Sequence, residues 1–166
     1  MKIDIYSGGD YTEVVKINKR ILILTDDSDE TEKMAAGIAA ALKEYRVSVK
    51  TASVFRGNDI LPADVIFLGC EKPKPKSFSY LEDLFKHINL AGRKCGAFTP
   101  RGKATIRGKT SGSAGGIPNG SIEKTRETVQ YLASIIRDSE AVMNPEPLFS
   151  DLQEAVKEWA QKVILN

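Results

Sequence analysis

The feature that most constrains the fold of this chain is the regular alternation, from residue 20 onward, of short apolar runs with segments of helical periodicity. The apolar runs are rich in β-branched and aromatic residues and read ILIL, VSVKTASVF, DVIFLG and KCGAF. The first segment between them repeats apolar residues every three or four positions, at Met34, Ile38, Leu42 and Tyr45. Such runs are typical of strands buried on both faces, and strands that alternate with helices predict a parallel sheet covered by helices on either side.

The same pattern gives the approximate bounds of each element. Strands are expected at residues 21–25, 47–55, 63–68, 94–99 and 141–143. Helices are expected at residues 31–45, 78–88, 121–137 and 150–165, with Ser121 as the N-cap of the third. Residues 56–62 leave room only for a loop or one helical turn. Trp159 has helical spacing with three apolar residues of the last helix, so we expect it in the core.

Residues 1–18 fall outside this unit. Ile3 and Ile5 alternate before a Gly-Gly turn, and Val15 and Ile17 alternate after it, which predicts a β-hairpin. The hairpin would either extend an edge of the sheet or make a homodimer contact. We therefore predict two parts, a hairpin extension at 1–18 and an α/β domain at 19–166.

Composition excludes several classes of protein. With 166 residues, 42% of them hydrophobic, the chain is long enough for one domain with a buried core. A formal net charge of +2 gives no overall attraction for nucleic acid or an anionic membrane. The longest apolar run, ADVIFLGC, is far below the ~20 residues of a membrane-spanning helix, and the N-terminus has no signal-peptide pattern. We expect a cytoplasmic protein, in which Cys70 and Cys95 lie too far apart for a disulfide.

An acidic turn joins the first predicted strand to the first predicted helix and reads TDDSDETEK at residues 25–33. A helix N-terminus offers free N–H groups and a partial positive charge, so a turn at this place often binds a phosphate. Here the chain supplies its own anions, namely Asp26, Asp27, Asp29, Glu30 and Glu32. Asp29 followed by Glu32 has the pattern of an N-cap with a capping box. We therefore expect this helix end to be capped by its own side chains.

The order of these parts resembles the flavodoxin-like family. The features that carry the resemblance are KRILIL, the hydroxyl- and acid-bearing turn ending in TEKMA, the DVIFLG strand with its following loop, the segment LAGRKCGAFTP and the EWA of the closing helix. They span residues 19–165. The resemblance implies a three-layer α/β sandwich around a five-stranded parallel sheet of order 2-1-3-4-5, with FMN bound at the carboxyl ends of the strands.

In that family the first loop follows the pattern T/S-x-T-G-x-T, and its hydroxyls and N–H groups surround the FMN phosphate. Ser28 and Thr31 match two of the hydroxyls, whereas Asp26 replaces the first hydroxyl and Asp29 replaces the glycine. A carboxylate a few ångströms from a phosphate costs about 1 kcal/mol in water, and several times more in a partly buried loop. We therefore predict that this phosphate site is closed.

The other two loops of such a site hold the flavin ring, typically between aromatic side chains. The resemblance places Cys70, Thr99 and Arg101 on these loops, beside Asp26, Ser28, Asp29 and Thr31. Phe78 and Tyr80 are expected at the start of a helix, and the loop after the fourth strand has no aromatic residue. Part of the expected ring site is therefore missing.

Basic residues fill these two loops instead: Lys72, Lys74 and Lys76 in one, and Arg101, Lys103, Arg107 and Lys109 in the other. The second belongs to a glycine-rich segment at residues 100–120 without periodicity, for which we expect a long mobile loop. The basic loops would face the acidic turn across one edge of the sheet. They would form an internal electrostatic latch, a site for a small anionic ligand or an acidic protein, or an ordinary solvated surface.

Other chemistries have less support. A receiver domain of two-component signalling needs an aspartate at the end of the third strand, where Gly69 stands. A metal site is not expected, because the single histidine, His87, lies on the polar face of a helix. Cys70 lies at the active edge of the sheet, where we expect a small buried residue rather than a reactive thiol.

Two functions follow from the sequence. The first is a non-catalytic binding or regulatory module without cofactor, which uses the basic loops. The alternative is a divergent FMN-binding electron-transfer protein in which Ser28 and Thr31 contact the phosphate.

Overall fold

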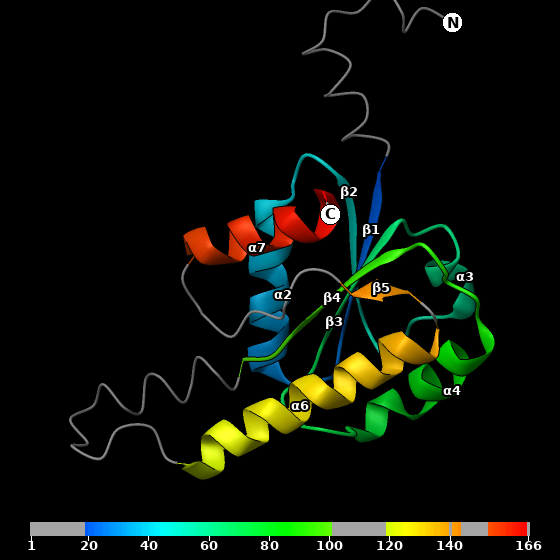
Figure 1. Ribbon diagram of the computed structural model, residues 1–166. Coiled ribbons are helices and arrows are strands. Elements are labelled where there is room, and N and C mark those ends of the chain that lie inside the picture. The colour runs from blue at the N-terminus through cyan, green and yellow to red at the C-terminus, as the bar shows by residue number, and fades with distance from the viewer. Residues whose placement is uncertain (1–18, 101–118, 140, 144–152, 166) are drawn as a thin grey trace, which may run out of the picture.

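The structure is a computed structural model that describes residues 19–100, 119–139, 141–143 and 153–165 (Figure 1). The predicted hairpin at 1–18 and most of the predicted loop at 100–120 lie outside the described residues, as do Arg101, Lys103, Arg107 and Lys109. No helix in the described part of the chain is long and apolar enough to cross a membrane.

The core of the fold is a parallel sheet of five strands in the order β2-β1-β3-β4-β5. The strands are β1 (Arg20–Thr25), β2 (Arg46–Thr51), β3 (Val65–Gly69), β4 (Lys94–Phe98) and β5 (Val142–Met143). This order and the all-parallel pairing confirm the predicted fold class. The short run at 141–143 is a real strand, which pairs with the first two residues of β4.

Helices cover both faces of the sheet, which makes the three layers visible in Figure 1. On one face lie α2 (Asp29–Ala41) and α7 (Gln153–Leu165), and on the other lie α3 (Gly57–Ile60), α4 (Ser79–His87) and α6 (Asn119–Asp138). A 3₁₀ turn, η2 (Lys76–Phe78), leads into α4. Successive residues of β1 point to opposite faces, so Ile21 and Ile23 pack toward α2 and α7 while Leu22 and Leu24 pack toward α4 and α6.

Close packing joins α7 to the sheet. The Trp159 and Phe67 rings meet edge to face, with centroids 5.3 Å apart. A Cβ at Gly96 would lie 3.0 Å from the Trp159 ring, so the absence of a side chain there allows the helix to approach β4. Trp159 is only 6% exposed, which confirms the prediction that it belongs to the core.

Arg93 fastens α3 to the beginning of β4. Its guanidinium donates hydrogen bonds of 2.6 Å to the carbonyl oxygens of Leu61 and Ala63, just after the helix. The last carbonyls of a helix lack intrahelical partners, so a cation there satisfies them. This contact holds the four-residue helix against the sheet.

Several predicted bounds were wrong in detail. The second strand ends at Thr51 rather than at residue 55, because the N–H groups of Val54 and Phe55 both turn back to the carbonyl oxygen of Thr51. The first helix spans 29–41 rather than 31–45. The third begins at Asn119, so Ser121 lies inside α6 and is not its N-cap.

Candidate functional site: the carboxyl edge of the sheet

Three strands end side by side at the carboxyl edge. Thr25 of β1 pairs in register with Gly69 of β3, and Gly69 pairs with Phe98 of β4. The loops that follow these strands therefore start next to one another. Gly69 has to be a glycine here, because an added Cβ would lie 2.2 Å from the Phe98 ring.

The structure brings together most of the residues that the sequence placed at this site. Asp26, Thr31, Cys70 and Thr99 are all buried at this edge, and Ser28 is half-buried. Asp29 differs, since it lies exposed in the first turn of α2, as do Glu30 and Glu32. Arg101 lies outside the described residues.

Asp26 is the centre of the arrangement. Its side chain is only 5% exposed, and both carboxylate oxygens accept hydrogen bonds. Oδ1 accepts from the N–H of Ser28 at 3.2 Å and from its hydroxyl at 3.0 Å. Oδ2 accepts from the N–H of Glu71 at 2.9 Å, in the loop after β3. A buried carboxylate is stable only when donors satisfy it, and among the described residues these three donors, all uncharged, do so.

Ser28, not Asp29, is the N-cap of α2. Its backbone is extended, and its Oγ accepts the N–H of Thr31 at 3.3 Å. Its Oγ also lies 2.7 Å from the Thr31 hydroxyl. The Ser28 hydroxyl is the donor to the Thr31 hydroxyl and to the Asp26 carboxylate, and because it has one proton these two hydrogen bonds are alternatives. The expectation that Asp29 caps the helix was wrong, although the helix end is capped by the chain itself.

These contacts decide how well the loop fits the phosphate of FMN. A phosphate on this turn needs the Ser28 and Thr31 hydroxyls and the N–H groups of the turn as donors. The Asp26 carboxylate already takes the N–H and hydroxyl of Ser28, and it adds a buried negative charge beside the phosphate position. The residues present therefore do not fit the phosphate group.

The loop after β3 presents its lysines to solvent. Lys72, Lys74 and Lys76 are exposed, whereas Pro73 and Pro75 between them are half-buried. Lys74 has a positive φ of 53°, a conformation that few residues other than glycine adopt. None of the three lysines forms an ion pair with a described residue, so the described structure contains no latch between them and the acidic turn.

The two aromatic residues near this loop point to other partners. Phe78 is completely buried and packs beside Tyr131 of α6, with ring centroids 6.3 Å apart. Tyr80 is partly exposed and packs on Phe55 at 5.5 Å. Both belong to the start of a helix, as predicted.

Both cysteines are free and buried. Burial raises the pKa of the Cys70 thiol, and the neighbouring Asp26 carboxylate raises it further. Burial also raises the pKa of Cys95, to about 12. The thiolate is the reactive form, so neither residue is a nucleophile near neutral pH. Among the described residues no group of acids, histidines or cysteines is placed to hold a metal ion.

We expect both thiols to resist Ellman's reagent in the native protein at mildly alkaline pH and to react at once in concentrated guanidinium chloride. Because their folded pKa values lie above the ordinary value of 9.0, stability is expected to fall as the pH rises above that value. Titration of thiols with Ellman's reagent in native and unfolded protein tests the expected resistance, and urea unfolding at increasing pH tests the expected loss of stability. Rapid labelling of one thiol in the native state would contradict the burial of Cys70 or Cys95.

Sequence reasoning missed one member of the site, the backbone N–H of Glu71. Every residue type except proline offers this donor, so no sequence pattern marks it. Only the pairing of β1 with β3 places it opposite Asp26.

Comparison with solved structures gives consistent likenesses. A short-chain flavodoxin associated with a non-canonical PDU bacterial microcompartment is 14% identical, with a TM-score of 0.70 over 90% of this chain and 98% of that one. Oxidised flavodoxin 2 from Bacillus cereus is 20% identical, with a TM-score of 0.68 over 88% and 98%. A Fusobacterium nucleatum flavodoxin variant bound to flavin mononucleotide is 9% identical, with a TM-score of 0.60 over 90% and 97%.

No protein-family profile and no curated protein matches the chain. Identities this low establish the architecture and leave the cofactor open. The strand order, the two helical layers and the likeness over nearly the whole length agree with one another. This chain is therefore a protein of flavodoxin-like fold.

Proposed function

We propose that this protein is a non-catalytic binding module, in which the carboxyl edge of a flavodoxin-like sheet recognises an acidic partner instead of a flavin. The observation that supports this proposal most is the buried Asp26 carboxylate, which accepts the N–H and the hydroxyl of Ser28, two donors that a flavin phosphate would use. The anion at this edge is therefore a side chain of the protein itself.

The binding surface is the lysine row, defined as Lys72, Lys74 and Lys76. Prolines alternate with these lysines, and the buried ring of Phe78 anchors the end of the segment. Proline restricts the backbone, so this segment loses less backbone entropy on binding a partner. Arg101 and Lys103 follow the buried Pro100 in the chain and would add to the same surface. A small anionic ligand or an acidic protein segment fits this charge.

Charge reversal of the lysine row tests the proposal directly. The triple variant K72E/K74E/K76E is expected to bind a fluorescent hexaglutamate peptide at least about tenfold more weakly than the wild type, since each exposed ion pair contributes about 0.2–1 kcal/mol. Fluorescence anisotropy at low ionic strength measures this. The control is K43E/K86E/K157E, which makes the same change in net charge at exposed lysines away from the edge. Equal weakening in both triples would show that only net charge matters and would refute the lysine row.

A second candidate function is FMN-dependent electron transfer. The likeness to flavodoxins favours it, one of them bound to flavin mononucleotide. Within the described residues the N–H groups of Asp29 and Glu30 have no acceptor, so two donors of the turn remain available. Purified protein that is yellow, or that quenches added FMN with micromolar affinity, would establish this candidate and end the first. A colourless protein that leaves FMN fluorescence unchanged would exclude it.

A further inference from the structure

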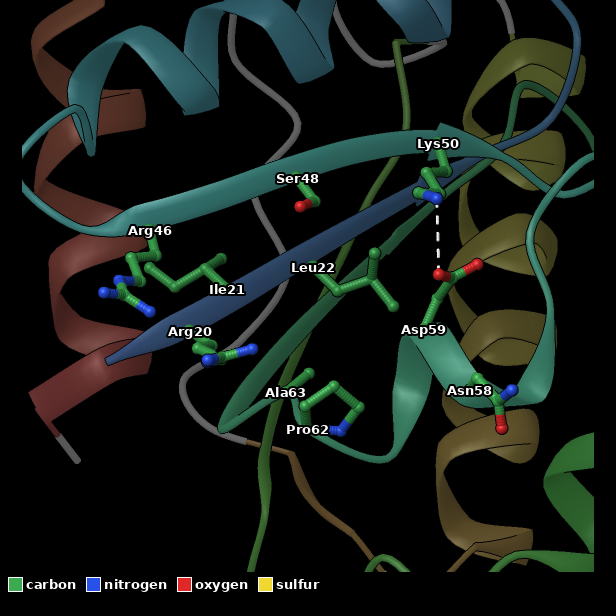
Figure 2. A pocket seen from close by; sticks show the side chains of 10 residues that line it. All are labelled: Arg20, Ile21, Leu22, Arg46, Ser48, Lys50, Asn58, Asp59, Pro62 and Ala63. Carbon is green, nitrogen blue, oxygen red and sulfur yellow. Dashed lines mark hydrogen bonds and ion pairs between the residues drawn. The ribbon is translucent and has the colours of Figure 1, made fainter. Parts of the chain in front are cut away.

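A basic groove lies on the face of strands β1 and β2 that α3 borders. Its lining residues are separate from the loops of the carboxyl edge. It has a volume of about 310 Å³, within the range of small-molecule sites. Figure 2 shows Arg20 and Arg46 at one end and the Lys50–Asp59 pair at the other, with Leu22 and Ser48 between them. Among the described helices, the one that borders this part of the sheet is α3, which has only four residues.

The arrangement of the two arginines is unusual for a strand pair. Arg20 and Arg46 begin adjacent parallel strands and are partners in register, so their side chains leave the same face of the sheet about 5 Å apart. Like charges directly opposite each other on neighbouring strands destabilise a sheet. Neither guanidinium forms an ion pair with a described residue. The nearby Asp64 carboxylate accepts the backbone N–H of Arg20, at 2.9 Å.

The two charged side chains at the other end of the groove, Lys50 and Asp59, are already paired with each other. Lys50 Nζ lies 3.2 Å from Asp59 Oδ1, and Asp59 also accepts the backbone N–H of Arg56 at 2.8 Å. Within the part of the chain that the structure describes, the positive charge of the groove that has no ion-pair partner therefore lies at the arginine end. Leu22, which is 3% exposed, contributes an apolar floor, Ser48 offers a hydroxyl near the middle, and Asn58 offers an amide at the Asp59 end (Figure 2). Two guanidinium groups beside an apolar floor suit a molecule with an anionic group at one end and a compact organic body.

We propose that this groove binds a small organic anion, with its phosphate or carboxylate held between Arg20 and Arg46 and its body lying over Leu22 toward Asn58. Guanidinium groups bind both kinds of oxyanion through paired N–H donors. The bound anion would also relieve the repulsion between the two arginines. This site is separate from the lysine row, so its failure would leave the proposed function of the carboxyl edge unaffected.

The test uses phenyl phosphate, benzoate and phenol as probes, with calorimetry for affinity and amide chemical shifts for position. Phenyl phosphate is expected to bind the wild type and to shift the amides of Arg46, Ser48 and Asn58, whereas phenol should bind negligibly. Benzoate distinguishes the source of the anion: binding as tight as that of phenyl phosphate indicates a carboxylate ligand, and weaker binding indicates a phosphorylated one. Raised salt is expected to weaken both anions.

Substitution of each arginine tests whether the two guanidinium groups bind the anion. Arg46→Gln and Arg20→Gln are each expected to weaken binding of phenyl phosphate about tenfold, and Arg46→Lys by less, because it keeps the charge but loses the paired donors. Lys43→Gln removes one exposed positive charge on the α2 side and is the matched control. The proposal is overturned if neither anion binds at millimolar concentration, if Arg46→Gln binds like Lys43→Gln, or if the shifts fall only on residues 26–31 and 70–76. Circular dichroism confirms that each variant is folded.

Discussion

Replacing Asp26 with serine is expected to raise the affinity of this protein for FMN by at least about 100-fold, because a carboxylate about 4 Å from a phosphate charge costs about 1 kcal/mol in water and about 4 kcal/mol near a protein surface. The substitution removes that charge and supplies the hydroxyl found at this position in flavodoxins. It also releases the N–H of Ser28 and that of Glu71. Quenching of FMN fluorescence in a titration of the purified variant measures the gain.

Asp27→Ser is the matched control for this experiment. Asp27 is the neighbouring acid, but its side chain is exposed and accepts a hydrogen bond from Ser53 at 3.2 Å. Its removal is expected to change FMN affinity by no more than about threefold, because solvent screens an exposed charge. If Asp26→Ser and Asp27→Ser behave alike, then Asp26 is not the barrier to phosphate binding. Tight FMN binding by the wild type would contradict the prediction that Asp26 closes the phosphate site.

The second large effect is on stability. Trp159→Ala is expected to lower the free energy of unfolding by about 3–5 kcal/mol, the usual cost of removing a large buried aromatic side chain. The indole fills the space between α7 and the sheet, against Phe67 and over Gly96, and partial collapse around it would not refill that volume. Trp159 is the only tryptophan of the chain, so urea unfolding has to be followed by circular dichroism rather than by fluorescence.

Leu165→Ala is the control in the same helix, since Leu165 is 74% exposed. A surface substitution of this kind is expected to change stability by no more than about 0.5 kcal/mol. Trp159→Phe keeps an aromatic ring against Phe67 and is expected to lose less than the alanine variant. An alanine variant as stable as Leu165→Ala would mean that α7 contributes little to the folded core.

Most of the fold was predictable because its strands are buried on both faces. The stretches at 21–24 and 65–68 are apolar throughout, which left little choice about where the central strands lie. The second strand was harder, because VSVKTASVF continues the β-branched pattern past the true end. Ala52 N–H still bonds to the carbonyl oxygen of Thr25, and the chain then turns, so that Val54 is 60% exposed. The turn in which the Val54 and Phe55 N–H groups bond to the Thr51 carbonyl oxygen ends this strand, and β-propensity alone does not reveal it.

The site was predictable to the level of the loop and not to the level of each contact. The acidic turn correctly indicated that the chain would supply its own anion. Which acid supplies the anion depends on where β1 ends. Because β1 ends at Thr25, Asp26 is the buried acid and Ser28, not Asp29, is the N-cap of α2. The pairing of Arg20 with Arg46 could not be predicted for a similar reason. The two residues are 26 positions apart in the sequence, and only the register of β1 with β2 makes them neighbours.

The attachment of α3 through Arg93 limits the width of the ligand that the groove can bind. Moving the helix outward to enlarge the opening would break two hydrogen bonds of 2.6 Å from the guanidinium to the Leu61 and Ala63 carbonyl oxygens. The opposite wall is a strand of the central sheet and does not move independently. Selection at the groove is therefore expected to depend on ligand width as well as charge, with slender anions preferred to bulky ones of equal charge.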